Sequence, residues 1–476
     1  MKKPARRNEK RDRQGLKPTL SAGGTARGPR GATTRADTKS AQSKDSALPL
    51  HLVQIEKPVY GGAFLARVEG KAVFVPLTLK GERARVRVVE EKRGYATAEV
   101  EEIVAAAAAR VAPACRHFGA CGGCQYQHAE YRTQLAYKQA ILRETLERGG
   151  VRAPEEMAVL AGAPWAYRNR IRVAFDAEGR AGYRGRRSHA VVPIAECPIA
   201  APLLVRAALD AGEIAHEMPS RLRPSEISLF CDAAETALLA CVTVAGGGKG
   251  RFEDFARALA ERIPETGGVE LLAAGGMGRE PRNVAQWGTS SLLYSADGFQ
   301  YRVDQGAFFQ VNRWLVDELV DCVTGGRHGG LAHYGELAWD LFAGVGLFAR
   351  RLAEQFNRVV AVESAPAAAA PLKQNLRGTR ATAVKAKTLD FLRGARNSER
   401  PDVVIVDPPR SGLGAETTAL LGEIAAPALT YVSCDPATLA RDLRGLLGKG
   451  YSIERVTLAD LFPQTFHLET VVELRR

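Results

Sequence analysis

The chain has 476 residues and a formal net charge of +13 at pH 7, and 46% of its residues are hydrophobic while 25% are charged. This composition is ordinary for a soluble globular protein, and the length predicts about two to four domains with a core each. No apolar run approaches the roughly 18 residues of a membrane span. No apolar segment follows the basic start, so no secretory signal is expected, and eight cysteines in so long a chain are no disulfide scaffold. We therefore expect a cytoplasmic protein.

The basic charge is concentrated at the start of the chain. The first 46 residues contain thirteen Lys and Arg but only four Asp and Glu, and they nearly lack large apolar residues. Such a composition predicts a disordered basic tail over residues 1–47. A basic tail favours a polyanion and binds it in a salt-sensitive way, although a tail that only adds solubility fits the composition equally well.

Residues 48–106 contain short β-rich runs that Gly61-Gly62 and Gly70-Lys71 separate. Between Arg83 and Val88, three apolar residues alternate strictly with three arginines. The apolar residues would face a core and the arginines would face outward. The pattern predicts a small OB-like barrel with a basic face that suits nucleic acid, and the alternative is a solvated charged strand.

A cluster of cysteines follows this region. Cys115, Cys121 and Cys124 are spaced C-x5-C-x2-C, and a fourth, Cys197, precedes a proline. Four thiolates can hold either a [4Fe–4S] cluster or Zn²⁺, and the spacing does not choose between them.

A helix that ends at the glycine pair 149–150 comes next, and residues 160–295 then mix strands with helices. Two stretches in this region, 167–172 and 183–187, interleave arginines with tyrosines. Aromatic and arginine side chains together suit RNA, through stacking and phosphate contacts.

From about residue 296, strands and helices alternate, which predicts a doubly wound sheet. The strand 337–342 is followed by a turn with Gly344 and Gly346 and then by a helix, and the next strand ends in Glu363. An acid about 20 residues beyond a glycine turn is placed to accept hydrogen bonds from a ribose. The two-glycine turn fits S-adenosylmethionine better than a dinucleotide, but a purely structural turn is an equal alternative.

Three polar residues lie directly after or within later apolar runs. Asp407 follows the apolar run 403–406, Cys434 follows the run 429–432, and Glu469 lies in the apolar run 465–472, which we expect to be a strand. Ligands bind at the carboxyl edge of such sheets, and a helix that begins behind Cys434 would lower its thiol pKa. The alternatives are a helix-capping Asp, a buried structural Cys and a solvent-facing Glu.

Five motifs now indicate a family. They are Gln305-Gly306-Ala307-Phe308-Phe309-Gln310-Val311-Asn312, Asp340-Leu341-Phe342-Ala343-Gly344-Val345-Gly346, Asp407-Pro408-Pro409-Arg410, Ser433-Cys434-Asp435-Pro436-Ala437-Thr438-Leu439-Ala440-Arg441-Asp442 and His467-Leu468-Glu469. In these motifs the chain from Leu50 to Arg476 resembles the bacterial RNA 5-methyluridine methyltransferases, and most of all the iron–sulfur 23S rRNA (uracil-5) enzymes.

The resemblance implies an α/β protein with a Rossmann-like class I methyltransferase domain. The implied parts are a TRAM barrel (48–106), an α+β central iron–sulfur and RNA-binding domain (107–128 and 160–295) and the methyltransferase domain (129–159 and 296–476). Its implied site residues are the nucleophile Cys434, the base Glu469, the cofactor residues Gln310, Phe342, Glu363 and Asp407, and the ligands Cys115, Cys121, Cys124 and Cys197 of a [4Fe–4S] cluster. Leu347 stands at a further cofactor position where the rRNA enzymes often carry Asn.

The chemistry of uracil methylation explains why a thiol and a base are both needed. Uracil C5 is a poor nucleophile until a thiolate adds to C6, and a base must afterwards remove the C5 proton so that the cysteine can leave. We therefore expect methyl transfer from S-adenosylmethionine to a uridine of 23S rRNA. The alternatives are the same reaction on tRNA and a non-catalytic RNA-binding factor of ribosome assembly. The sequence indicates no membrane contact and no obligate protein partner.

Overall fold

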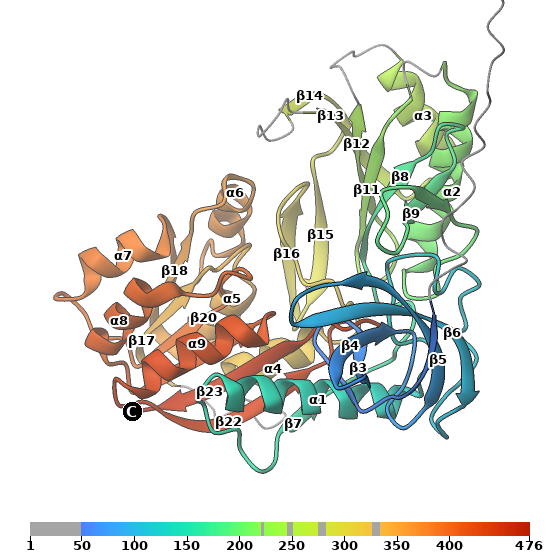
Figure 1. The fold of residues 1–476 in the computed structure, drawn as a ribbon. Helices are drawn as coiled ribbons and strands as arrows, with labels where there is room; N and C mark the ends of the chain where they lie inside the picture. Colours follow the sequence, from blue (N-terminus) through green and yellow to red (C-terminus); the bar gives the residue numbers. More distant parts are fainter. Residues whose placement is uncertain (1–48, 220–222, 245–250, 275–281, 326–333) are drawn as a thin grey trace, which may run out of the picture. The chain divides into compact units, whose positions relative to one another are not determined.

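A computed structural model describes residues 49–219, 223–244, 251–274, 282–325 and 334–476. The predicted basic tail, residues 1–47, lies outside this described part. Residues 49–476 form one compact unit, which contains sheets of six, seven and eight strands and one two-stranded hairpin among its described residues (Figure 1).

The six-stranded sheet is the predicted barrel. Its strand order is β1-β5-β6-β4-β3-β2, from β1 (Leu50–Gln54), β2 (Lys57–Pro58), β3 (Ala63–Val68), β4 (Lys71–Pro76), β5 (Arg83–Glu91) and β6 (Tyr95–Ala105). The expected alternation in β5 is confirmed, because Ala84 and Val86 are fully buried. The arginines of β5 face away from this core, but two of them have acidic neighbours on β6. Arg87 lies 2.9 Å from Glu101 and Arg85 pairs with Glu102, which reduces the basic character of this face.

The seven-stranded sheet forms the central part and has an apolar face covered by two helices. Its order is β10-β9-β8-β11-β12-β13-β14, from β8 (Arg170–Phe175), β9 (Ala181–Arg184), β10 (Val191–Pro193), β11 (Glu226–Cys231), β12 (Leu238–Val244), β13 (Thr266–Ala273) and β14 (Arg282–Gly288). The helices α2 (Pro202–Glu217) and α3 (Phe252–Arg262) contribute Leu204 and Leu259 to one apolar cluster with Ile227 of β11. The predicted α+β class of this region is confirmed.

The eight-stranded sheet confirms the predicted doubly wound fold. Its order is β19-β18-β17-β20-β21-β23-β22-β7, from β7 (Ala158–Leu160), β17 (Gly335–Leu341), β18 (Phe356–Glu363), β19 (Ala381–Lys385), β20 (Val403–Val406), β21 (Ala428–Ser433), β22 (Ser452–Ala459) and β23 (Glu469–Arg475). Strands β17 to β21 pair in parallel, whereas β23 runs antiparallel to both of its neighbours. Successive residues point into different cores: Ala338 and Ile405 into one, Trp339 and Val404 into the other.

Helices cover both faces of this sheet. On one face lie α4 (Val316–Thr324), α5 (Leu347–Gln355) and α6 (Pro366–Asn375), with the hairpin of β15 (Ser291–Ala296) and β16 (Phe299–Asp304); on the other lie α1 (Tyr131–Arg148), α7 (Thr388–Ala395), α8 (Gly414–Ile424) and α9 (Pro436–Leu447). None of the helices in the described ranges has the length and apolar character needed to span a membrane.

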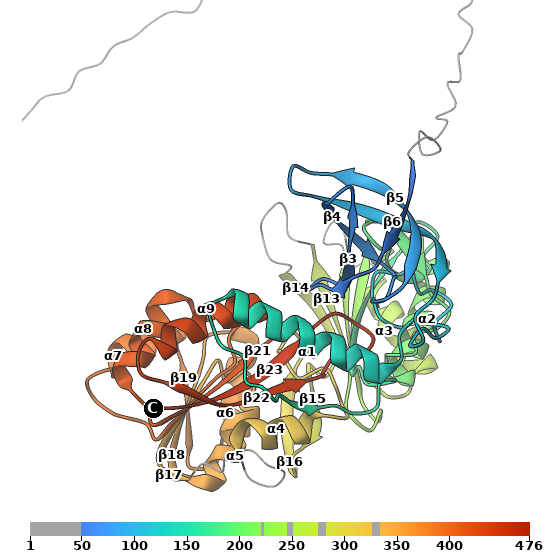
Figure 2. The ribbon, with the colours of Figure 1, turned by 60° about the horizontal axis from the view of Figure 1, so that its bottom comes forward.

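Helix α1 confirms the predicted helix and its end, because Gly149 is its C-cap. It runs beside β22 and β23 in both views (Figures 1 and 2). Leu142 and Leu146, in its second half, pack into the core, but its first half also buries the polar side chains of Gln134 and Lys138. These two residues need polar partners, because a buried polar group without a hydrogen bond is costly.

The predicted strand 465–472 is wrong in its first half, because β23 begins only at Glu469. Residues 460–468, here named the strap, connect β22 to β23 without regular structure. Pro463 lacks the N–H that a sheet ladder needs, and Gln464 has a φ of 68°, which a strand does not allow. Thr465–Leu468 have a composition typical of a strand, but Pro463 and Gln464 before them prevent the strand from starting there.

One buried ion pair holds the barrel together. Glu82 has no exposed surface, and its carboxylate accepts hydrogen bonds from the N–H groups of Leu79 (2.7 Å) and Ala107 (3.2 Å) and from Arg110 (2.5 and 2.8 Å). We predict that Glu82→Ala lowers the local stability of the barrel by about 3 kcal/mol, because two N–H groups lose their acceptor and the Arg110 guanidinium keeps only the carbonyl of Leu77.

The control for this substitution is Glu102→Ala, which removes an exposed partner of Arg85 and should cost less than about 1 kcal/mol. Amide hydrogen exchange in β3 to β6 measures both effects. Equal losses in the two variants would contradict the stabilising role of the buried pair.

Candidate functional site

Four predicted residues line one edge of the eight-stranded sheet. Glu363 ends β18, Phe342 follows β17, Asp407 follows β20 and Cys434 follows β21. These strands are neighbours in the order β18-β17-β20-β21 and all run in parallel, so their carboxyl ends meet at the same edge. This is where open α/β sheets bind ligands.

A fifth residue, Glu469, reaches the same edge from the opposite direction. Strand β23 is antiparallel to β21, so its first residue lies at the edge where β21 ends. Ser433 pairs with Thr470, and continuing this register by one residue places Cys434 beside Glu469. Neighbouring strands lie about 4.8 Å apart, which brings a thiol and a carboxylate together.

The glycine turn after β17 leaves open space at this edge. Phe342, Gly344 and Gly346 all have positive φ values of 67°, 55° and 92°. A Cβ atom on Gly344 would meet nothing within 4 Å, whereas one on Gly346 would lie 2.9 Å from Leu372. Gly344 therefore faces free space that a ligand can enter, and Gly346 lets Leu372 of α6 pack closely against the turn.

Glu363 is fixed beside this turn. Its Oε2 accepts the N–H of Gly344 at 2.9 Å, and its Oε1 accepts the N–H groups of Ser364 and Ala365 at 2.6 Å each. These bonds hold the carboxylate in place next to the open side of Gly344. Its remaining lone pairs can accept hydrogen bonds from a ligand.

Two other predicted cofactor residues do not lie directly at the ends of these strands. Leu347 begins α5, is 6% exposed and belongs to the core. Gln310 lies in the segment between β16 and α4, where its carbonyl oxygen accepts a hydrogen bond from Asn169 at 2.8 Å. In the described residues, no hydrogen bond joins Gln310 to the five residues at the sheet edge. The role of both in cofactor binding stays a prediction.

The thiol of Cys434 does not have the lowered pKa that the sequence predicted. Burial raises its pKa to about 11, and the charges of Glu469 and Asp407 act in the same direction, while Arg410 opposes them. The helix start behind it contributes little, because the carboxylate of Asp435 already accepts the N–H groups of Ala437 and Thr438, at 3.0 and 2.9 Å. The resting thiol is therefore protonated.

Burial also raises the pKa values of the carboxyl groups at this edge. The pKa of Asp407 rises to about 7, and that of Glu469 rises well above its usual value, first through burial and then through the charge of Asp407. Arg410 opposes the shift at Glu469, and its guanidinium lies 3.5 Å from Nδ1 of His467. Strongly perturbed groups that gather at a ligand edge are typical of a catalytic site.

The four predicted cysteine ligands line a single cavity of about 200 Å³. Arg168 and Tyr183 also line it, and the hydroxyl of Tyr183 lies 3.6 Å from Sγ of Cys197. In the described part of the chain, no three His, Cys, Asp or Glu side chains converge as they would around a single metal ion. The four cysteines therefore line a common cavity.

A larger groove of about 670 Å³ lies between the barrel, the cysteine segment and the central sheet. Its lining includes Phe74 of the barrel, Gly122 and Gly123 of the cysteine segment, and Arg172, Tyr183, Arg184, Arg186 and Arg187 of the central part. The predicted stretch 183–187 thus lies where an RNA strand could reach arginines and aromatic rings together.

The other predicted RNA stretch, 167–172, is mostly structural. Tyr167 is fully buried, and the guanidinium of Arg170 lies 4.2 Å from the ring centroid of Phe230 and donates to the carbonyl of Ala307 at 2.7 Å. Only Arg172 of this stretch lines the groove. The prediction of RNA contacts is therefore wrong for most of these residues, because internal partners already occupy them.

Sequence reasoning missed a barrel residue at the site. Tyr60 packs edge to face against Phe466 of the strap, with ring centroids 5.5 Å apart. Burial raises its pKa to about 12, and the charges of Asp435 and Cys434 contribute, so its hydroxyl lies within electrostatic reach of the thiol. The only signal in the sequence is an aromatic residue beside a glycine pair at 61–62.

The raised pKa of Cys434 predicts its reactivity. Between pH 7 and 9, alkylation of Cys434 by iodoacetamide should accelerate about tenfold per pH unit, because the thiolate fraction rises in that proportion below a pKa of about 11. At pH 9 Asp407 is ionised, so Asp407→Asn should speed alkylation further. Mass spectrometry of the peptide that carries Cys434 measures the rate, and a rate already constant from pH 7 would contradict this prediction.

Comparisons with known proteins agree with this geometry. A family model described as TRAM domain matches residues 51–100, and one described as tRNA (Uracil-5-)-methyltransferase matches residues 289–476. The chain is 33% identical over 439 residues to the 23S rRNA (uracil(1939)-C(5))-methyltransferase RlmD of Halomonas elongata, with 88% of each chain covered. It is 35% identical over 482 residues to the enzyme of the same name from Chromohalobacter salexigens, with 97% of this chain and 94% of that one covered.

A solved structure shares the fold. It is the Pyrococcus abyssi tRNA (uracil-54, C5)-methyltransferase in complex with S-adenosyl-L-homocysteine, with a TM-score of 0.70 at 23% identity over 89% of this chain and 100% of that one. The motifs and the sheet edge they form agree with the match to relatives of more than 30% identity over most of both chains. This chain belongs to the family of S-adenosylmethionine-dependent RNA (uracil-5)-methyltransferases that carry a TRAM domain.

Proposed function

We propose that this enzyme methylates C5 of a uridine in 23S rRNA, with Cys434 as the nucleophile and Glu469 as the base. The observation that carries the proposal is the register of β21 and β23, which sets the thiol beside the carboxylate at the ligand edge of the sheet. The 23S substrate is supported by the names of the relatives at 33% and 35% identity. An rRNA substrate also implies a cytoplasmic enzyme.

The first half of the reaction belongs to Cys434. Its thiolate adds to C6 of the uracil, and the electron pair of the C5–C6 double bond moves into an enolate centred on C5 and O4. S-Adenosylmethionine supplies an electrophilic methyl group, which C5 then accepts. Because burial raises the pKa of Cys434 to about 11, the thiol must pass its proton to water as the substrate binds.

The second half belongs to Glu469. After methylation C5 carries both a hydrogen and the new methyl group, and the Glu469 carboxylate removes that hydrogen as a proton. The electron pair of the C–H bond restores the C5–C6 double bond and expels Cys434 as a thiolate. The raised pKa of Glu469 makes its ionised form a stronger base than an exposed carboxylate.

Residues at the carboxyl ends of β17 and β18 suit the cofactor. Glu363 and the open face of Gly344 suit the ribose hydroxyls, and the ring of Phe342 offers an apolar contact at the strand end. Asp407 lies between these two strands and Cys434 in the strand order, so it can contact either cofactor or uracil. We assign Gln310 and Leu347 to the same cofactor site by their motifs.

The groove lined by residues 183–187 is proposed as the path of the RNA. Arginines there can contact phosphates while Phe74 and Tyr183 stack on bases. The target uridine must leave its stack to reach the sheet edge, so a surface that holds single-stranded RNA beside the site assists the reaction.

Labelled methyl transfer tests this function. We expect incorporation into 23S rRNA and none into separate 16S rRNA or tRNA, and none at all with Cys434→Ala, because the enolate cannot form without the thiol. Glu469→Gln should instead accumulate a covalent enzyme–RNA adduct that resists denaturing electrophoresis, because the last proton is not removed.

Three outcomes would contradict the proposal. Methylation of tRNA alone would reassign the substrate, full activity of Cys434→Ala would exclude the thiol mechanism, and an inactive wild-type enzyme that still binds RNA would favour the non-catalytic factor. Circular dichroism of every variant checks that the fold is intact, so that a loss of activity is not mistaken for a loss of structure.

We further propose that Cys115, Cys121, Cys124 and Cys197 hold a [4Fe–4S] cluster. All four line one cavity of about 200 Å³, and the resemblance of the chain to the iron–sulfur enzymes favours a cluster over a single zinc ion. Methyl transfer needs no electron, so such a cluster would act by cross-linking the cysteine segment to the central sheet.

Metal analysis of anaerobically purified protein checks this assignment. We expect about four iron and four sulfide per chain and a visible absorption band that disappears in Cys197→Ser. Stoichiometric zinc without sulfide would show that the four cysteines form a zinc site instead.

A further inference from the structure

The strap, residues 460–468, leads directly into the proposed base Glu469. It has no regular structure, yet six of its nine residues are buried, among them Asp460, Gln464 and Leu468. Irregular segments normally run over the surface, because their backbone N–H and C=O groups need water or other partners. The strap therefore depends on side chains from elsewhere in the chain.

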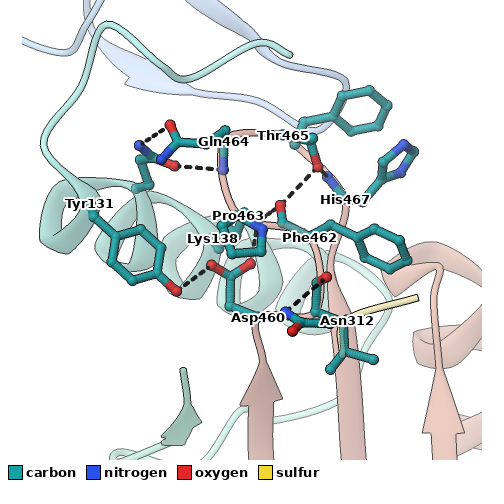
Figure 3. A network of polar contacts seen from close by, with 12 residues as sticks. Tyr131, Lys138, Asn312, Asp460, Phe462, Pro463, Gln464, Thr465 and His467 are labelled. Atoms are coloured by element: carbon teal, nitrogen blue, oxygen red, sulfur yellow. Dashed lines mark hydrogen bonds and ion pairs between the residues drawn. The ribbon is translucent and has the colours of Figure 1, made fainter. Parts of the chain in front are cut away.

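Helix α1 supplies the first of these partners. Lys138 and Asp460 form an ion pair at 2.5 Å in which neither side chain is exposed (Figure 3). Lys138 also donates to the carbonyl of Phe462 at 2.9 Å, and the hydroxyl of Tyr131 donates to Asp460 at 2.9 Å. The start of the strap is thus fixed to the first half of α1.

The middle of the strap is fixed by a pair of glutamines. The side chain of Gln134 accepts the N–H of Gln464 at 3.0 Å and donates to its side-chain oxygen at 2.9 Å. The N–H groups of Gln125 and Tyr126 both donate to the Gln464 carbonyl at 3.0 Å. Gln464 has a φ of 68°, and such a conformation in a residue other than glycine persists only where surrounding contacts hold it.

Two further segments fasten the strap. Asn312 donates to the carbonyl of Leu461 at 3.3 Å, and the hydroxyl of Tyr167 donates to the carbonyl of Pro463 at 3.0 Å. Cys434 depends on other contacts: β20 pairs with β21, and Asp435 caps the helix that follows. The proposed nucleophile and the proposed base share the pairing of β21 with β23, but the strap leads only into the base.

We infer that the strap positions Glu469 for proton abstraction, with Gln134 and the Lys138–Asp460 pair as its anchors on α1. The inference rests on the proposed function, in which Glu469 is the base. Gln134, Lys138 and Asp460 are positioning residues, since they act through the strap. Weakening their contacts should slow release of the cysteine while leaving its addition to uracil unchanged.

The variant Gln134→Leu removes both side-chain bonds to Gln464 and leaves no charge buried. In single-turnover reactions with uridine-containing 23S rRNA, we expect it to release methylated RNA about 10- to 100-fold more slowly and to accumulate the covalent adduct. In a substrate that contains 5-fluorouridine, fluorine replaces the hydrogen at C5, so the base has no proton to remove there. The reaction with this substrate therefore stops at the covalent adduct. The rate of adduct formation with that RNA should match the wild type.

Matched controls separate positioning from general loss of stability. Leu146→Ala removes a fully buried side chain from the other half of α1 and should lower the melting temperature without accumulating adduct. Lys138→Met combined with Asp460→Asn removes the ion pair without leaving an unpaired charge and should behave like Gln134→Leu.

Two outcomes would overturn the inference alone. One is that Gln134→Leu releases product at the wild-type rate while Glu469→Gln accumulates adduct. The other is that Gln134→Leu slows adduct formation on 5-fluorouridine RNA as much as it slows turnover. If Glu469→Gln itself accumulates no adduct, the assignment of the base fails, and the inference fails with it.

Discussion

The antiparallel pairing of β21 with β23 is the constraint on which the site depends. In a wholly parallel sheet every strand would end at the ligand edge, and a base that begins a strand could not reach it. Because β23 runs the other way, Glu469 begins where Cys434 follows the end of its strand. A slip of one residue would turn Glu469 to the opposite face of the sheet, so the buried pattern of β23 also fixes the chemistry.

This arrangement places acidic groups together in a poorly solvated place. Burial raises the pKa values of Cys434, Asp407 and Glu469, so each of them resists ionisation in the resting enzyme, and the guanidinium of Arg410 opposes the shift at both Cys434 and Glu469. The proposed reaction nevertheless requires a thiolate at Cys434 and later a carboxylate at Glu469. Interactions between charges are strong where water is excluded, so small displacements of these groups change their reactivity considerably. Precise positioning of the base is therefore as important as its identity.

The sequence predicted the parts of the site that follow from strand order. Glu363, Asp407 and Cys434 follow from the sequence because each ends or follows a short apolar run, and the ends of parallel strands meet, whereas Phe342 follows only from the family resemblance. The sequence did not predict the strap, because the partners of Gln464 lie more than 300 positions earlier in the chain and include side chains such as Gln134 that look solvent-facing on a helix. The buried arginine Arg170 was mistaken for an RNA contact for the same reason: its partners, Phe230 and Ala307, are distant in sequence.

The strap also links the eight-stranded sheet to the barrel and to the cysteine segment. It joins two strands of the eight-stranded sheet, its Phe466 packs against Tyr60 of the barrel, and its Gln464 accepts the N–H groups that follow Cys124. A neutral hydrogen bond contributes about 1 kcal/mol net, and the left-handed backbone at Gln464 costs about 1–2 kcal/mol, so the four bonds at this residue are enough to hold it. The barrel and the cysteine segment therefore contact the segment that precedes Glu469. The proposed RNA groove and the proposed base Glu469 are thus linked through one segment, so in this proposal RNA held between the barrel and the central sheet lies beside elements that contact the strap.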